Sequence, residues 1–198
     1  GRGGQRLRPV LSPDRVGRLT ASWHPEALGY GYLSGKAAWE RWNGLTEPDD
    51  VAKGFMAWGH DHEADAVAYF EGVTGIIPDR TGDDQLFTPF DVWAGCTTDG
   101  LIEDWGLLEC KAPRSLPEKP KDGHWVQVQS QLHITQRQTG YLSIWTPDGS
   151  SLWTTQAIPE YWTLAEPLLK TYHAMLCAPK PPGRWKKPKL NLDIQWER

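Results

Sequence analysis

The sequence predicts one α/β or α+β domain, spanning 1–198, in which helices flank a central mixed sheet. Apolar residues recur at the three-to-four spacing of a helix in three segments, residues 55–74, 124–138 and 160–177. Short apolar runs bounded by Gly, Pro and Asp are typical of strands, and they occupy residues 96–112, 140–145 and 152–158. The 198 residues are enough to bury a substantial core. We expect that core over about 12–178, followed by a basic tail or arm over 179–198.

The first helix is predicted from its cap residues. Ser12-Pro13-Asp14 is typical of a helix start, because Ser accepts a backbone hydrogen bond and Pro suits the first helical position. That helix would present Arg15, Arg18 and Ser22 along one side.

A glycine-rich stretch follows at residues 29–35. It lacks both the G-x-G-x-x-G spacing and the GK[ST] ending of phosphate-binding loops, so we interpret it as a loop into a helix over 36–43. Trp39 and Trp42 in that helix are expected to pack in the core rather than to stack on bases, because burial is the usual fate of large aromatic side chains.

The helix predicted over 55–74 carries an unusual carboxylate. Glu63 falls on its apolar stripe, and a carboxylate that faces a core is costly unless it is paired or binds a metal. The alternative is a Glu at the edge of the stripe that reaches solvent or bonds a Lys. Gly59, one turn earlier, would allow another backbone to approach closely. His60 and His62 point away from each other on a helix, so we expect them to face solvent or DNA rather than one zinc ion.

Residues 96–112 predict a hairpin with a three-residue loop over 104–106, whose final glycine would adopt the left-handed conformation. In this register Asp99 lies opposite Lys111. Side chains alternate between the faces of a strand, so Glu109 and Lys111 share one face and Asp99 joins it. A slip of one residue would move Asp99 to the other face.

Two neighbouring carboxylates repel each other, and this repulsion raises the pKa of one of them unless a cation is present. Mg²⁺ prefers a few carboxylate oxygens together with water and substrate phosphate. Beside such an ion Lys111 could hold the attacking water and balance charge on a phosphate. The hairpin alone is equally compatible with a plain surface face of Glu and Lys.

The second half of the chain completes the predicted sheet, whose centre we expect over 86–112. Residues 113–123 are rich in Pro and Lys and predict a loop, which could engage substrate or serve as a plain connector. The helix over 124–138 places Gln127 and Gln131 on one side, where glutamines can orient water or phosphate. The last helix should bury Leu164, Leu168, Leu169, Tyr172 and Met175. The tail over 184–198 is an arm or an added strand.

Composition excludes several classes of protein. No apolar run approaches the ~20 residues that cross a bilayer, so we expect no membrane association, and no stretch resembles a signal peptide. The three cysteines, Cys96, Cys110 and Cys177, are odd in number and contain no CxxC pair. This pattern argues against a disulfide framework and against a four-cysteine metal site, and it favours a reducing cytoplasm.

The charge is unevenly distributed. The formal net charge is −4, and residues 47–109 carry fifteen acidic side chains against Lys53 and Arg80. Basic residues gather near both ends and in a cluster after the hairpin, Lys111, Arg114, Lys119 and Lys121. Binding to a DNA backbone requires a local cationic surface rather than a positive net charge. A solvated tail or loop is the alternative for each cluster.

Four motifs occur in one order that resembles a known family. Asp99 and Glu109-Cys110-Lys111 resemble the D…ExK signature of restriction-endonuclease-like nucleases. The residues that surround it resemble the lambda exonuclease family, also called YqaJ-type viral recombinase nucleases. Those segments are R-x-G-x-x-T-A-S at 15–22, M-A-W-G with E-A-D-A over 56–66, and Q-x-Q at 127–129. The resemblance spans roughly residues 14–145 and implies a restriction-endonuclease-like core.

The resemblance implies a metal site. Asp99, Glu109 and the backbone carbonyl of Cys110 would bind the main ion, and Glu63 would support the site. The cofactor would be Mg²⁺, with two ions expected and Mn²⁺ able to substitute. Lys111 would then orient the nucleophilic water.

The resemblance implies that Gln127 would help Lys111 to orient the nucleophilic water. It also implies contacts to DNA. Arg15 and Ser22, together with Thr97, would hold the 5′ phosphate of a DNA end. Met56 stands where such enzymes place an apolar wedge between the terminal bases.

Two positions depart from the family's pattern. Pro117 stands where a basic residue is expected, so Arg114 or Lys119 would take its place. His124 stands where a relative carries Tyr.

The resulting hypothesis is a Mg²⁺-dependent exonuclease that degrades the 5′-ended strand of double-stranded DNA. It would release 5′ mononucleotides and leave a 3′ overhang for phage-type recombination with a single-strand annealing protein. The resemblance also implies a homotrimeric ring and a phage or prophage origin in a bacterial cytoplasm. An endonuclease of the same superfamily, an inactive DNA-binding module and a chance match to an unrelated protein remain alternatives.

Overall fold

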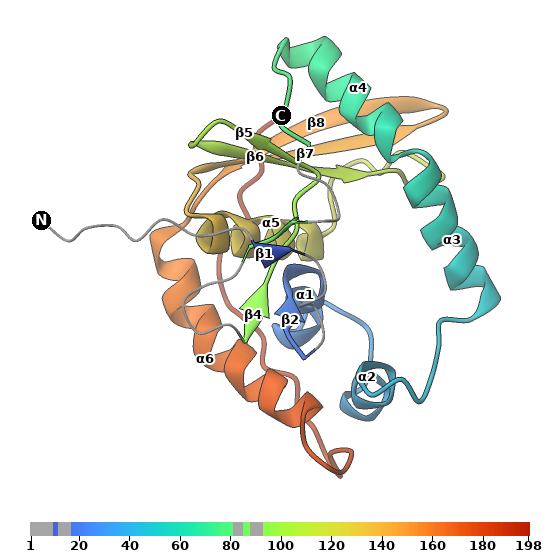
Figure 1. Ribbon diagram of the computed structural model, residues 1–198, viewed down its shortest axis with the longest axis vertical. Coiled ribbons are helices and arrows are strands. Elements are labelled where there is room, and N and C mark those ends of the chain that lie inside the picture. The colour runs from blue at the N-terminus through green and yellow to red at the C-terminus, as the bar shows by residue number, and fades with distance from the viewer. Residues whose placement is uncertain (1–9, 12–16, 81–84, 88–92) are drawn as a thin grey trace, which may run out of the picture.

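A four-stranded mixed sheet lies at the centre of the computed structural model, which describes residues 10–11, 17–80, 85–87 and 93–198. The strands lie in the order β5, β6, β7 and β8 (Figure 1). Their bounds are β5 Gly100–Ile102, β6 Gly106–Lys111, β7 Thr139–Thr146 and β8 Gly149–Gln156. Strands β6 and β7 are parallel and the two outer pairs are antiparallel. The predicted mixed sheet flanked by helices is confirmed.

Helices cover both faces of this sheet (Figure 1). Helix α4, Glu63–Thr74, packs through Ala66, Val67 and Phe70 on the face that carries Leu108. Helix α5, Asp122–Thr135, packs through Val128 and Leu132 on the face that carries Leu107. Because successive side chains of a strand alternate, Glu109 then points toward α5.

Gly140 on β7 explains how closely α5 approaches the sheet. A Cβ atom at this position would lie 2.3 Å from Cγ1 of Val128. A larger residue would therefore push the helix, and the glutamines it carries, away from β6.

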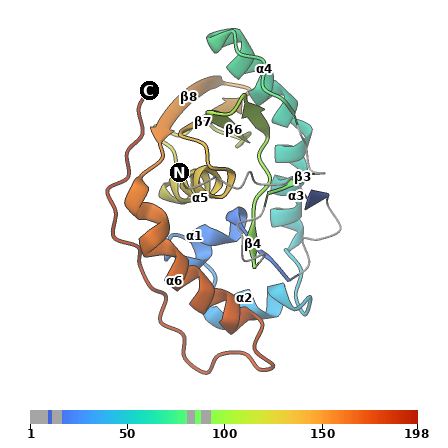
Figure 2. The same ribbon diagram turned by 60° about the vertical axis from the view of Figure 1, so that its left-hand side comes forward.

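A second layer packs below α5. It contains α1, His24–Ala27; α2, Gly35–Trp42; and α6, Pro159–Leu176. Their core includes the buried rings of Trp125, Tyr161 and Tyr172. Figure 2 shows α6 lying alongside α1, with the end of the chain running past its outer side. The predicted loop into a helix near residue 36 is confirmed, and Trp39 packs against this core and donates to the carbonyl of Ala178 at 2.8 Å.

Two short strand pairs lie outside the central sheet. Strand β1, Val10–Leu11, pairs with β3, Gln85–Leu86, and β2, Leu19–Thr20, is parallel to β4, Ala94–Gly95. The expectation that 86–112 forms the sheet centre is confirmed for β6 and wrong for the rest, because β7 is the other central strand and β3 and β4 lie outside this sheet. Residues 12–16 of the predicted first helix lie outside the described residues. The part of it that the structure describes, 17–22, is a turn, β2 and the start of the 3-10 helix Ala21–Trp23.

The long helix predicted over 55–74 is two helices. Helix α3, Asp50–Asp61, ends at His62, whose φ of −111° is not helical, and α4 begins at the next residue. The imidazole of His62 stacks on Trp145 with a centroid distance of 4.9 Å and contacts Trp58 at 4.1 Å. This aromatic contact with β7 favours the break, and no spacing along the helix could reveal it.

The hairpin of β5 and β6 differs from the prediction by two residues. Its loop comprises residues 103–105, because Ile102 pairs with Gly106. Glu103, with φ of 47°, adopts the left-handed conformation that was expected of Gly106. A Cβ atom on Gly106 would lie 3.2 Å from Cβ of Ile102, its partner across the hairpin, so the glycine relieves a tight contact within the pair. A shift of two residues preserves the face on which each side chain lies.

The last helix and the tail complete the domain. Leu169, Tyr172 and Met175 are buried as predicted, but Leu164 is 47% exposed and Ala165 is buried in its place. The amide of Leu190 donates to the carbonyl of Leu28 at 3.1 Å. The tail thus packs against the second layer rather than extending away from it.

The end of the chain also reaches the central sheet. Glu197 and Thr154 exchange backbone hydrogen bonds of 2.9 and 2.8 Å, which adds one antiparallel bridge to the edge of β8. Among the helices that the structure describes, none is long and apolar enough to cross a membrane.

Candidate active site

The carboxyl end of β6 brings the predicted acidic and basic residues together. They line a pocket of about 260 Å³ with Gly59, His60, Glu63, Asp99, Glu109, Cys110, Lys111 and Ala112 at its wall. The lining residues come from three segments: the junction of α3 and α4, the residue before β5, and the end of β6. No side-chain carbon of Gly59 closes this space, and a Cβ atom there would meet nothing within 4 Å. The close backbone approach expected at Gly59 is therefore wrong.

Glu109 is the most extensively bonded group in the pocket. Its Oε1 accepts hydrogen bonds from Nζ of Lys111 at 2.5 Å and from Nε2 of Gln127 at 2.7 Å. Its Oε2 accepts from Nε2 of Gln131 at 2.6 Å. The side chain is almost wholly buried, so these donors fix the orientation of its carboxylate at the pocket wall.

Asp99 lies across the hairpin from Glu109. Its Oδ2 accepts a hydrogen bond from the backbone amide of Cys110 at 2.6 Å. Burial, and next the charge of Glu109, hold the pKa of Asp99 well above its ordinary value, although Lys111 opposes the shift. A cation beside Asp99 would favour its ionised form.

Lys111 keeps its charge at this site. Burial disfavours the ammonium form, but the carboxylates of Glu109 and Asp99 together outweigh that effect, so the pKa of Lys111 lies above its ordinary value. A charged ammonium group at the pocket wall can donate to a water molecule or to a phosphate oxygen.

Glu63 does not face the core. It is the first residue of α4, its side chain is 33% exposed, and its Oε1 accepts from Nη2 of Arg80 at 3.0 Å. The edge-of-stripe alternative describes it better, with Arg80 rather than a Lys as the partner. Glu63 nevertheless lines the pocket, and its charge adds a small contribution to the raised pKa of Asp99, after those of burial and Glu109.

The donor set fits a hard divalent ion bound partly by water. Among the described residues, no three His, Cys, Asp or Glu side chains converge closely enough to hold a metal ion by themselves. Mg²⁺ requires fewer, because it commonly uses one or two carboxylates together with water and substrate phosphate. Asp99 and Glu109 supply two. Burial, and next the charge of Glu109, raise the pKa of Asp99, and a cation bound between the two carboxylates would oppose both effects. The side chain of Cys110 alternates with that of Glu109 and packs with Ala66, Val67 and Phe70 of α4, so its backbone carbonyl is the atom that could reach an ion beside Glu109.

The predicted DNA contacts fall into two places. Ser22 and Thr97 each follow, by two residues, the pair Thr20 and Gly95 of the parallel strands β2 and β4. This register brings the two residues out at the same end of the strand pair. Arg15 lies outside the described residues.

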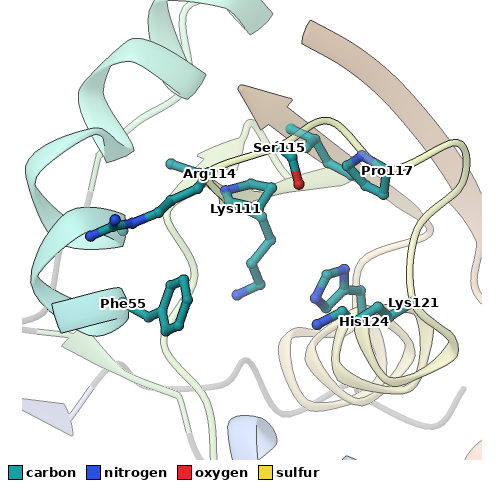
Figure 3. A pocket seen from close by; sticks show the side chains of 11 residues that line it. Phe55, Lys111, Arg114, Ser115, Pro117, Lys121 and His124 are labelled. Atoms are coloured by element: carbon teal, nitrogen blue, oxygen red, sulfur yellow. The ribbon is translucent and has the colours of Figure 1, made fainter. Parts of the chain in front are cut away.

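The other predicted contacts lie on or beside α3. Met56 is 65% exposed, as a residue that contacts DNA would have to be. The guanidinium of Arg114 lies 5.3 Å from the ring centroids of both Phe55 and Trp58. Figure 3 shows Arg114 and Phe55 on one wall of a larger pocket, into which Lys111 points.

Comparison of the sequence with protein-family models identifies the family to which this chain belongs. The model of the YqaJ-like viral recombinase domain matches residues 13–138, which include every residue of the pocket described above. The chain belongs to the YqaJ-like viral recombinase family. No curated protein matches it.

Solved structures show the same fold. The alkaline exonuclease LHK-Exo of Laribacter hongkongensis is 22% identical, with a TM-score of 0.67, and the match covers 83% of this chain and 90% of that one. Its complex with dAMP gives a TM-score of 0.68 at the same identity and coverage. A phage-related exonuclease from Haemophilus somnus is 10% identical, with a TM-score of 0.61 and coverage of 80% and 94%. At these identities the likeness establishes a restriction-endonuclease-like fold.

Within this YqaJ-like domain, two polar residues of the site were not among the predicted site residues. Gln131 was placed on the same helix side as Gln127, but it bonds the carboxylate of Glu109 rather than water or phosphate, and that partner was not predicted. His124 lines the larger pocket beside Lys111, one turn before Gln127. Gln129, the second glutamine of the Q-x-Q motif, faces the other way and bonds the backbone of Ile158 and Gln156.

Proposed function

We propose that this protein is a Mg²⁺-dependent 5′-to-3′ exonuclease that acts on the ends of double-stranded DNA. The observation that carries the proposal is the cluster of Asp99, Glu109 and Lys111 around one pocket, with both oxygens of Glu109 held by donors. Membership of the YqaJ-like family supports a nuclease.

The residues would divide the work of phosphodiester hydrolysis. Asp99, Glu109 and the carbonyl of Cys110 would hold Mg²⁺, with Glu63 supporting them after it leaves Arg80. When bound, the ion supplies Lewis-acid stabilisation of charge on the phosphate and lowers the pKa of water. Lys111 orients the attacking water through its ammonium group. Gln127 donates to Oε1 of Glu109, so the carboxylate keeps its position when the ammonium group of Lys111 moves to contact water.

The polarity of the reaction would come from an end-binding pocket. Arg15, Ser22 and Thr97 would hold the terminal 5′ phosphate, and the register of β2 and β4 supports the proximity of the last two. Met56 would separate the terminal bases. The product would be a 3′ overhang for a single-strand annealing partner, and three copies of the chain would enclose the duplex as a ring.

The proposal is tested by digestion of linear duplex DNA labelled at either the 5′ or the 3′ end, beside closed circular DNA. With Mg²⁺ we expect early release of the 5′ label as mononucleotide, intact circles, and no reaction in EDTA. Cut circles would support an endonuclease instead. Binding without any cleavage would identify an inactive DNA-binding module.

A further inference from the structure

A larger pocket of about 620 Å³ adjoins the acidic one. The two share Gly59, Lys111 and Ala112 in their walls, so a ligand can extend from one into the other. Figure 3 shows Lys111 pointing into this space between Phe55 and His124.

The charges of the two pockets are opposite. The smaller pocket carries the carboxylates of Glu63, Asp99 and Glu109. The wall of the larger one carries Lys111, Arg114 and Lys121 and, among the described residues that line it, no Asp or Glu. The carboxylates would hold one phosphate of a DNA strand through a metal ion. The cationic pocket beside them suits the next phosphate of the same strand.

His124 presents an unused polar atom in this pocket. Its Nδ1 is buried and has no hydrogen-bond partner among the described residues, which is unfavourable for a polar atom. Burial, and then the charges of Lys111 and Lys121, lower the pKa of His124 to about 3, so the ring is neutral. In the tautomer that carries its proton on Nδ1, it can donate to a phosphate oxygen.

The opposite wall is aromatic. The guanidinium of Arg114 lies over the rings of Phe55 and Trp58. These two contacts involve no carboxylate, and they orient the guanidinium. The ring of Phe55 forms part of the pocket lining and is more than half exposed. Any of the four bases can stack on such a ring, so this contact would not depend on the DNA sequence.

Helix α5 sets the order of the sites. His124 lies at the larger pocket, Gln127 at Oε1 of Glu109, and Gln131 at Oε2 of Glu109 and the carbonyl of Thr97. The seven residues from His124 to Gln131 rise about 10 Å along the helix. The larger pocket is therefore on the side of the carboxylates away from Thr97.

We propose that this pocket binds the nucleotide on the 3′ side of the scissile phosphate. His124 and Lys121 contact its backbone phosphate, and Phe55 offers a face to its base. The assignment of the 3′ side rests on the proposed function, because it places the 5′ end of the strand at Thr97.

The test measures the binding of 5′-phosphorylated duplex DNA in EDTA by fluorescence anisotropy. An uncharged methylphosphonate replaces the second linkage from the 5′ end in one duplex and the eighth linkage in a control duplex. We expect the wild type to bind the first modified duplex roughly fivefold more weakly than the unmodified one and to tolerate the second.

Two variants then locate the contact. His124→Phe removes the ring nitrogens, and Lys121→Gln removes a charge; each should bind unmodified DNA more weakly than the wild type, and each should lose clearly less than about fivefold from the modified second linkage, because one of the two contacts is already gone. Lys36→Gln is the matched control, since Lys36 is 68% exposed on α2 and should behave as the wild type.

An equal additional loss in the wild type and in both variants would overturn the proposal, as would the absence of any effect at the second linkage. If circular dichroism shows that His124→Phe does not fold, Lys121→Gln decides the outcome. Cleavage of unmodified DNA with Mg²⁺ is measured separately. If the wild type does not cleave DNA, but the variants still reduce the loss caused by the modified second linkage, the proposed exonuclease activity is refuted and the proposed pocket is supported.

Discussion

Gln131 and Glu109 are joined by a hydrogen bond of 2.6 Å from the amide Nε2 to the carboxylate Oε2. The same nitrogen donates to the carbonyl of Thr97 at 2.9 Å. Both side chains are buried, so this amide connects the segment expected to hold the DNA end with a proposed metal ligand. Such supporting contacts usually determine how accurately a ligand is oriented.

Gln131→Leu should therefore reduce the single-turnover cleavage rate roughly 10- to 100-fold, because it leaves Oε2 of Glu109 unpaired. The matched control is Gln129→Leu on the same helix, which removes bonds to Ile158 and Gln156. That change should cost about 1–3 kcal/mol of stability in urea unfolding, with a smaller effect on the rate. A Gln131→Leu protein that cleaves at the wild-type rate would show that the contact is purely structural.

Lys111→Ala should lower cleavage by roughly 100-fold or more, because it removes the ammonium group that orients water and balances phosphate charge. DNA binding in EDTA should persist, because Glu109 already pairs with that ammonium group in the free protein. Rates and binding are measured on the same duplex, with Lys36→Ala as the control. Full activity in Lys111→Ala would remove this residue from the mechanism.

Asp99→Asn should weaken Mg²⁺ binding in a calorimetric titration. In the wild type the raised pKa of Asp99 means that the ion competes with a proton, so affinity should increase with pH as the carboxyl ionises. The variant should lose most of this pH dependence. An identical titration for both proteins would exclude Asp99 as a ligand.

Arg15→Ala should abolish the preference for 5′-phosphorylated ends over 5′-hydroxyl ends, since it removes a cation from the proposed end-binding pocket. Ser22→Ala should reduce the same preference less. The measurement compares initial rates on both kinds of end. A wild type that degrades the two kinds equally would argue against the pocket as a whole.

His24 predicts a loss of stability in mild acid. Its ring is fully buried, with Nδ1 at 2.7 Å from Oγ of Ser130, and burial lowers its pKa from 6.5 to about 4. The unfolded chain therefore binds the proton in this pH range while the folded chain does not, so stability falls as pH decreases from 6.5 toward 4. Between pH 7 and 5 this contribution is about 2 kcal/mol.

His24→Gln should reduce the pH dependence of urea unfolding by about that amount. It would not remove the dependence, because burial also lowers the pKa of His133 and of His124. His60→Gln, on the exposed side of α3, is the control. If the curves of wild type and His24→Gln are parallel, His24 does not carry the effect.

Local patterns predicted the site better than they predicted the backbone around it. The alternation of β6 and the D…ExK spacing placed Glu109, Lys111 and Asp99 together correctly, because an even shift of register leaves faces unchanged. Gly106 misled the choice of loop, because it is the first residue of β6 and pairs with Ile102 across the hairpin. A glycine after Asp and Trp is typical of a loop, so local composition did not distinguish this paired position from the last position of the loop.

The break at His62 was also hidden from local patterns. Hydrophobic spacing continues through α3 and α4, whereas the cause of the break is a ring on β7, Trp145. The break turns Glu63 into a first-turn residue bonded to Arg80, so its placement on a buried stripe was wrong. The helix period placed Gln131 on the same face as Gln127, but it could not identify Glu109 as the partner of both glutamines, because that contact depends on how α5 packs on β6.

The path of the last residues has a consequence for synthesis on the ribosome. The indole of Trp125 donates to the carbonyl of Gln195, and the edge of β8 at Thr154 bonds Glu197. The ammonium of Lys187 reaches Glu26 at 2.7 Å, and the carboxylate of Glu26 accepts from the backbone of the glycine-rich loop. Until these late residues emerge, a nascent chain leaves the loop, the indole and the sheet edge incompletely bonded. The N-terminal half cannot reach its final structure ahead of the rest, so the domain completes its folding as a whole after Glu197 has been translated.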